Sequence, residues 1–268
     1  MNTSIPTNAR LSTASTPPAG TTGPALSARG LSKSYQSPVL TKLDLDIEQG
    51  QFVAIMGPSG SGKSTLLHCL SGMDRPTDGS VLLGETEMTT LSEKELAALR
   101  LTHFGFVFQQ AHLMATLCLL DNIVLPGFLA GLRPRPEVTA RGEELMERMG
   151  IAELAASSVT EVSGGQLQRA GICRALINDP GIVFADEPTG ALNSATALQI
   201  LDLLGQVHAS GTTLVMVTHD AQVAARADRV LVLVDGRIVE DLSLGRHEEA
   251  EAPSRLTTVT EALQRRSV

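Results

Sequence analysis

The amino-acid sequence predicts an α/β fold with three parts: a core with a mainly parallel β-sheet, an antiparallel β subdomain and an inserted α-helical subdomain. Short apolar runs alternate with longer helical patterns on both sides of the insertion, as βαβ units require. Within residues 39–48, positions 43–48 alternate apolar and acidic side chains, which indicates a strand with one face in solvent. Between about residue 110 and residue 178 the pattern becomes mostly helical, which marks the insertion.

The segment before the insertion is expected to hold several strands and two helices. The strands cover residues 25–34, 39–48, 52–56, 81–83 and 105–109. The sequence Gln49-Gly50 predicts one turn, and residues 76–79 predict another before the short fourth strand. Ser92 and Glu95 have the spacing of a capping box, which predicts a helix that begins there.

Two helices are expected in the insertion, and the βαβ pattern resumes after it. The first, residues 137–149, ends at Gly150, and the second, residues 165–177, ends before Pro180, where proline disfavours continuation. The dipeptide Asp235-Gly236 predicts a tight hairpin near the end of the fold. The remaining strands cover residues 182–185, 212–217, 229–234 and 237–240, and the remaining helices cover 196–208 and 221–225.

Length and composition fit one α/β domain over residues 26–245. The formal net charge of −8 argues against a nucleic-acid partner, which needs a basic surface. The three cysteines are far apart and have no metal-binding spacing, which indicates reduced thiols in a cytosolic protein. Residues 1–25 are expected to be a disordered leader without a signal peptide, and residues 246–268 a charged tail with a helix at 256–264.

One apolar stretch, residues 113–132, imitates a membrane span. It contains Asp121, Asn122 and Pro126, and an acid at mid-span costs about 2.5–3.5 kcal/mol. We therefore expect this stretch to be buried inside the protein or to dock against a partner.

The strand at residues 52–56 leads into a glycine-rich loop and then into a helical pattern. Glycines let the backbone turn tightly and aim successive N–H groups at one point, where a helix N-terminus adds the positive end of its dipole. In such a P-loop, Lys63 reaches the β- and γ-phosphates of a nucleotide, and the Ser64 hydroxyl is a ligand for Mg²⁺. A chance glycine turn is the alternative, and the flanking strand and helix disfavour it. The loop comprises Gly57, Pro58, Ser59, Gly60, Ser61, Gly62, Lys63, Ser64 and Thr65.

Polar side chains also follow three other predicted strands. Strand 182–185 ends in Asp186, a candidate Mg²⁺ ligand, and Glu187, a candidate to orient or deprotonate the attacking water. His219 follows the strand at 212–217, and Gln109 ends the strand at 105–109, where its amide is suited to contact Mg²⁺ or the water. A solvated turn is the alternative at each position. Because ligands bind at the carboxyl edge of such sheets, these side chains together predict a catalytic site.

A second glycine turn precedes the helix at residues 165–177. It comprises Ser163, Gly164, Gly165 and Gln166, has no lysine and therefore cannot replace the first loop. Helix N-termini are suited to bind anions. Two chains arranged head to tail could close both helix N-termini over one ATP, which predicts a homodimer with two composite sites.

These motifs, in this order, resemble the nucleotide-binding subunits of ABC transporters over roughly residues 26–245. The resemblance implies that Tyr35 stacks on adenine, that Gln109 is the Q-loop glutamine and that residues 163–166 are the signature. It implies that Asp186 and Glu187 form Walker B with its catalytic glutamate, and that His219 is the switch histidine. The cofactors would be ATP and Mg²⁺. The partners would be a second ATPase subunit and an integral membrane permease, whose coupling helix docks beside Gln109 at the inner, cytoplasmic face of the cell membrane.

Within that family the sequence is similar to the ATPases of lipoprotein release, macrolide export and antimicrobial-peptide resistance, which implies export or mechanotransmission. Residues 105–110, 112–114, 121–123, 125–126 and 186–190 carry this similarity. One departure is Asn193, which stands where the family usually has aspartate. Two alternatives stay open at this point: a soluble ABC ATPase outside transport, and a weakly active, nucleotide-gated regulatory subunit.

Overall fold

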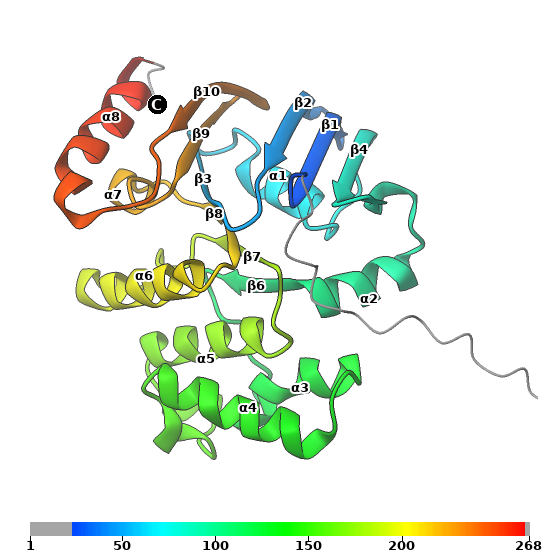
Figure 1. Cartoon of the computed structure of the whole chain (residues 1–268), viewed down its shortest axis with the longest axis vertical. Helices are drawn as coiled ribbons and strands as arrows, with labels where there is room; N and C mark the ends of the chain where they lie inside the picture. The colour runs from blue at the N-terminus through cyan, green and yellow to red at the C-terminus, as the bar shows by residue number, and fades with distance from the viewer. Residues whose placement is uncertain (1–22, 266–268) are drawn as a thin grey trace, which may run out of the picture.

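The computed structural model describes residues 23–265 and contains two β-sheets with helices packed around them (Figure 1). The larger sheet has six strands in the order β10-β9-β3-β8-β7-β6, and all its pairings are parallel except that of β10 with β9. The predicted α/β class with a mainly parallel sheet is therefore confirmed. Its strands are β3 (Phe52–Met56), β6 (Phe104–Phe108), β7 (Ile182–Asp186), β8 (Thr213–Val217), β9 (Arg229–Val234) and β10 (Arg237–Ser243).

The central strand β3 is buried on both faces, which explains its unbroken apolar sequence. Successive side chains of a strand point to opposite faces of the sheet. Phe52, Ala54 and Met56 accordingly pack in one hydrophobic cluster with helices of the insertion, and Val53 and Ile55 pack in a second cluster on the other face. The helices of the larger core are α1 (Lys63–Leu70), α2 (Glu93–His103), α6 (Ser194–Ala209) and α7 (Ala221–Ala224).

The smaller sheet is antiparallel, with strands in the order β2-β1-β4-β5. Its alternating burial matches the alternating sequence, because one face covers the second hydrophobic cluster while the other meets solvent. The sequence pattern does not reveal β5, which has only two residues. The strands are β1 (Leu26–Ser34), β2 (Pro38–Ile47), β4 (Asp78–Leu83) and β5 (Thr86–Glu87).

The insertion folds as three packed helices, α3 (Leu119–Ala130), α4 (Arg135–Arg148) and α5 (Gly164–Leu176), which form a separate layer in Figure 1. Helix α3 lies in the apolar stretch 113–132 and contains Pro126. The buried amide of Asn122 accepts from Met114 N–H (2.6 Å) and donates to Met114 and Cys118 carbonyl oxygens. No helix among residues 23–265 is long and apolar enough to cross a membrane.

The C-terminal helix α8 (Ala252–Arg265) packs against α7 and begins four residues before the predicted helix. Its Val259 and Ala262 are fully buried. The buried guanidinium of Arg255 donates to backbone carbonyl oxygens of Ala225 (2.8 Å), Ala227 (2.5 Å) and Leu244 (2.9 Å). The tail is thus attached to the α/β core by both packing and hydrogen bonds. Residues 1–22 of the predicted leader lie outside the part of the chain that the structure describes.

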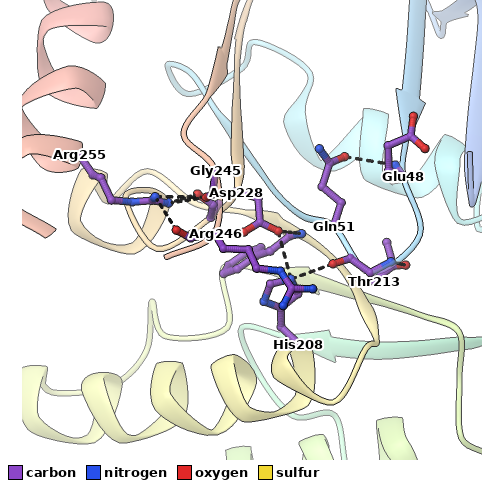
Figure 2. A network of polar contacts seen from close by, with 11 residues as sticks. Glu48, Gln51, His208, Thr213, Asp228, Gly245, Arg246 and Arg255 are labelled. Atoms are coloured by element: carbon purple, nitrogen blue, oxygen red, sulfur yellow. Dashed lines mark hydrogen bonds and ion pairs between the residues drawn. The ribbon is translucent and has the colours of Figure 1, made fainter. Parts of the chain in front are cut away.

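A polar network fixes the amino-terminal edge of the larger sheet (Figure 2). His208, in the last turn of α6, lies with Nε2 3.1 Å from Asp228 Oδ2 and 3.0 Å from the Gly50 carbonyl oxygen. Asp228 also accepts from the backbone N–H of Phe52 at 2.8 Å. This network joins α6 to the starts of β3 and β9, at the edge opposite the predicted catalytic residues.

Candidate functional site

The register of the parallel strands brings the predicted catalytic side chains to one edge of the sheet. Phe108 of β6 pairs with Asp186 of β7, which pairs with Val217 of β8. The residues that follow these strand ends therefore lie side by side. A cavity of about 380 Å³ at this edge is lined by Ser64, Phe108, Gln109, Gln110, His112, Asp186 and Glu187.

The P-loop connects β3 to α1 through glycines that take positive φ angles. Gly57 has φ 148°, and a Cβ there would lie 2.0 Å from the Leu233 carbonyl oxygen, so no other residue fits. Gly62 caps α1 with φ 100° and approaches β2, where a Cβ would lie 3.0 Å from the Val39 carbonyl oxygen. The loop therefore rests on the ends of β9 and β2. Pro58, Ser59 and Gly60 are exposed at its tip.

Lys63 is the first residue of α1, and its ammonium group folds back along the loop. It donates to the carbonyl oxygens of Gly57 (2.9 Å) and Pro58 (2.8 Å). Partial burial lowers the pKa of Lys63, while the carboxylates of Glu187 and Asp186 act in the opposite direction. Thr65 follows in the first turn of α1, half-buried. The Lys63 ammonium group thus lies between the P-loop and the two acids, Asp186 and Glu187.

Hard oxygen donors from α1 and β7 meet beside the loop. The Ser64 hydroxyl donates to Asp186 Oδ1 at 3.2 Å. Burial raises the pKa of the Asp186 carboxyl, and the hydrogen bond from Ser64 opposes this shift. Gln109 lines the same cavity, and its amide packs so close to Gly190 that a Cβ there would lie 2.8 Å from Nε2.

Glu187 has a left-handed backbone conformation with φ 46°, which is rare for a residue other than glycine. Its N–H donates to the Val217 carbonyl oxygen, and its own carbonyl accepts from Gly190 N–H, both at 3.0 Å. These bonds hold a conformation that costs about 1–3 kcal/mol, and such strain is concentrated at functional sites. The Oε2 atom of Glu187 lies 3.2 Å from Nδ1 of His219, whose side chain is exposed.

Residues 163–166, the predicted signature, lie at the N-terminus of α5 in the insertion. Ser163 Oγ accepts from Gln166 N–H, and Gln166 Oε1 accepts from Ser163 N–H at 2.8 Å, which completes a capping box. A Cβ on Gly165 would lie 2.5 Å from Thr196 Cγ2 of α6, whereas a Cβ on Gly164 would meet only Leu192 at 3.8 Å. Within the described residues, no hydrogen bond or ion pair links residues 163–166 to the P-loop.

Two predicted positions lie at the margins of this site. Tyr35 lies between β1 and β2, is 62% exposed, and donates its hydroxyl to Asp74 Oδ2 at 2.5 Å. Asn193 caps α6 by accepting from Thr196 N–H at 3.0 Å, so this departure from aspartate retains a helix cap. No sequence motif indicates the contacts of Tyr35, because Asp74 is 39 residues away along the chain.

The fold and the phosphate-binding loop define a P-loop NTPase core, and comparison with known proteins identifies its family. The family model described as ABC transporter matches residues 40–190. The chain therefore belongs to the ABC transporter family, as its sequence motifs predict.

Curated relatives and solved structures agree with this assignment. The chain is 46% identical over 232 residues to the macrolide export ATP-binding/permease protein MacB 1/2 of Paracoccus denitrificans, covering 85% of this chain and 35% of that protein. It is 45% identical over 224 residues to MacB of Rhodopseudomonas palustris strain HaA2, covering 82% and 34%. The predicted similarity to macrolide-export ATPases is thus confirmed. The chain spans about a third of the length of these relatives.

Two solved structures of MJ0796, described as a bacterial ABC transporter cassette, are similar over their whole length. A dimeric structure is 37% identical and has a TM-score of 0.77, covering 83% of this chain and 100% of that one. A dimeric post-hydrolysis state bound to ADP and Pi is 35% identical and has a TM-score of 0.74, with the same coverage.

Proposed function

We propose that this chain is the ATP-hydrolysing subunit of an ABC transporter and that it drives an integral membrane permease in export or mechanotransmission. The observation that carries the proposal is the convergence of Ser64, Asp186, Glu187 and Gln109 on one cavity beside the P-loop. The two acids there have different surroundings: Asp186 accepts a hydrogen bond from the Ser64 hydroxyl, and Glu187 faces His219. One acid is thus suited to hold a cation and the other to act on water.

ATP binding would begin at the P-loop. Backbone N–H groups of the loop and of the first turn of α1 would surround the β- and γ-phosphates, and the dipole of α1 favours the negative charge. Lys63 would exchange its two carbonyl acceptors for phosphate oxygens. A solved structure of a relative supports this proposal of nucleotide binding, because it is described as bound to ADP and Pi.

The oxygen donors beside the loop fit Mg²⁺. Within residues 23–265 no group of three or more His, Cys, Asp or Glu residues could hold a metal by itself. This suits Mg²⁺, which prefers oxygen and is usually held by one or two carboxylates together with waters and substrate phosphates. Ser64, Asp186 and Gln109 would hold the ion. When bound, it would neutralise charge that develops on the phosphates.

Glu187 would position the attacking water and accept its proton. A general base must lie within hydrogen-bond reach of that water, and the bonds to Val217 and Gly190 fix the backbone from which Glu187 acts. His219 would keep the carboxylate oriented, from 3.2 Å away, and contact the γ-phosphate.

The second half of each site would come from another copy of the chain. Residues 163–166 offer a capped helix N-terminus that has no link to the P-loop of its own chain within the described residues. A head-to-tail homodimer would place this turn of one subunit over the ATP of its partner. The dimeric cassettes among the solved relatives support this arrangement.

The permease would dock in a groove beside the catalytic edge, at the inner, cytoplasmic face of the membrane. A groove of about 410 Å³ lies between α2, β6, α3 and the end of α5, and its lining includes Phe104, Phe106 and Pro126. Leu129, in the last turn of α3, and Leu132, just beyond the helix, add exposed apolar surface (68% and 51% exposed). The names of the MacB relatives, which combine ATP-binding and permease, favour transport over the two alternatives.

A phosphate-release assay on the purified chain with ATP and Mg²⁺ tests the enzymatic part. We expect hydrolysis that Lys63→Ala removes, and no measurable release would favour the regulatory alternative. Co-purification from membranes tests the transport part. Charged substitutions on the exposed surface beside the groove, such as Leu129→Asp, should release the chain from its permease without loss of nucleotide binding.

A further inference from the structure

We propose that Asp74 and Lys33 are positioning residues that hold the Tyr35 ring in place as a rigid platform for the adenine base. This inference rests on the proposed binding of ATP and on the expectation, implied by the family resemblance, that Tyr35 stacks on adenine. It adds two residues that belong to no phosphate-binding or catalytic motif. Its physical basis is that an exposed ring must be ordered before it can bind a base without an entropic cost.

The two residues hold Tyr35 from different directions. Asp74 Oδ2 accepts from the phenol hydroxyl at 2.5 Å, and Asp74 Oδ1 accepts from Lys33 Nζ at 2.6 Å. The Lys33 ammonium also lies over the ring, 4.7 Å from its centroid. Lys33 is only 8% exposed, and a desolvated cation interacts more strongly with a ring face than an exposed one does. One face of the ring is therefore covered by Lys33.

The face of the Tyr35 ring opposite Lys33 is exposed to solvent. Tyr35 as a whole is 62% exposed although both its hydroxyl and one face have partners. Because the hydroxyl is already bonded to Asp74, the ring offers a base its π-face rather than a hydrogen bond. Stacking is thus the interaction that this side chain can supply.

Asp74, the anchor of the platform, is hydrogen-bonded to the helix that begins at the phosphate site. Helix α1 begins at Lys63, and beyond its last turn the Asp74 N–H donates to the His68 carbonyl oxygen at 3.1 Å. The hydrogen bond to Asp74 raises the pKa of the Tyr35 phenol, and Thr65 of the P-loop lies close enough to oppose that shift. The ring is therefore fixed relative to the phosphates, as a site for a whole nucleotide requires.

Calorimetric titration of the full chain with ADP and, separately, with pyrophosphate tests the inference. Tyr35→Phe keeps a stacking ring and the Lys33–Asp74 ion pair but loses the hydroxyl. We expect this variant to weaken ADP binding by about threefold to tenfold, because the ring is no longer held in one orientation before the base binds. Pyrophosphate binding should be unchanged. Asp74→Ala, which removes both acceptor oxygens, should cause a similar loss, and the double variant should lose no more than either single variant.

Two controls separate this role from a purely structural one. Asp78→Asn removes an exposed charge from the first residue of β4 without touching Tyr35, and it should bind ADP as the wild type does. The chain has one tyrosine and no tryptophan, so tyrosinate absorbance reports on Tyr35 alone. In Asp74→Ala the phenol should ionise at lower pH than in the wild type.

The outcomes are distinguishable. Wild-type affinity for ADP in Tyr35→Phe, or additive losses in the double variant, would overturn the positioning role while leaving adenine stacking intact. Equal weakening of ADP and pyrophosphate would overturn it in favour of a structural role. If the wild type binds ADP no more tightly than pyrophosphate, the adenine platform itself is refuted.

Discussion

Nδ1 of His219 lies 3.2 Å from Oε2 of Glu187, although the two residues follow different strands of the sheet. Glu187 ends its strand in a strained, left-handed conformation, and His219 is exposed at the end of the neighbouring strand. The contact joins the residue proposed to act on water to the one proposed to contact the γ-phosphate. The contact makes the position of one side chain dependent on that of the other.

Substitution of Glu187 by glutamine should abolish steady-state ATP hydrolysis while ATP binding is retained. The amide keeps the shape and can still accept hydrogen bonds, but it cannot take a proton from water. General bases contribute about 10²–10⁴-fold to rates, so turnover should fall by at least that factor. Phosphate release measures turnover, and calorimetry measures binding. Hydrolysis near the wild-type rate would refute the catalytic assignment.

Substitution of His219 by alanine should lower turnover by about tenfold or more without a large change in ATP affinity. The carboxylate of Glu187 would lose its neighbour at 3.2 Å and rotate more freely. An oriented group is worth more than a mobile one because misplacement costs rate steeply. His103→Ala, on the exposed end of α2, is the matched control. Equal turnover in both variants would contradict a role for His219.

The His208–Asp228 pair should make stability depend on pH. The hydrogen bond to Asp228 raises the pKa of His208, against burial, so its contribution is complete below the unfolded pKa of about 6.5 and disappears as pH rises through the folded value. Burial raises the pKa of Asp228, but hydrogen bonds from His208 and Phe52 outweigh it, so the net shift is downward. The contribution of Asp228 therefore falls away as pH drops through its folded value.

Thermal unfolding of His208→Gln and wild type across mildly acidic to alkaline pH measures this dependence. The difference in Tm should be largest in mildly acidic solution and should shrink at alkaline pH. The positive charge of Arg246 acts to lower the pKa of His208 and therefore limits the size of this difference. A difference in Tm that grows with rising pH would contradict a raised pKa of His208.

Gly105→Ala should destabilise the fold by about 1–3 kcal/mol, the usual cost of overpacking. A Cβ there would lie 2.6 Å from the Ala175 carbonyl oxygen of α5, where the insertion meets β6. Gly181→Ala is the control, since its Cβ would have no neighbour within 4 Å. Chemical denaturation compares the two variants. Equal stability would mean that α5 can move away from β6 at little cost.

The P-loop and the strand-end acids are predictable from sequence because their geometry is local. A strand, a glycine turn and a helix fix the loop, and the carboxyl edge of a parallel sheet then gathers Asp186, Glu187 and His219. Helix α3 is harder to predict, because its largely apolar sequence lacks a polar face and contains Pro126. The contacts of Asp74 with Tyr35 and of Asp228 with His208 join distant parts of the chain, so no spacing indicates them.

The central claim is that each ATP site is composite, and size measurement tests it most directly. Glu187→Gln with ATP and Mg²⁺ should sediment as a dimer of the 28.2 kDa chain, and with ADP as a monomer. Gly164→Glu, added to that variant, should fold normally, because a Cβ there meets only Leu192 at 3.8 Å, yet it should block the dimer by repelling phosphate. A monomer with ATP at high protein concentration and with the permease present, or a dimer indifferent to ADP and to Gly164→Glu, would contradict the composite site.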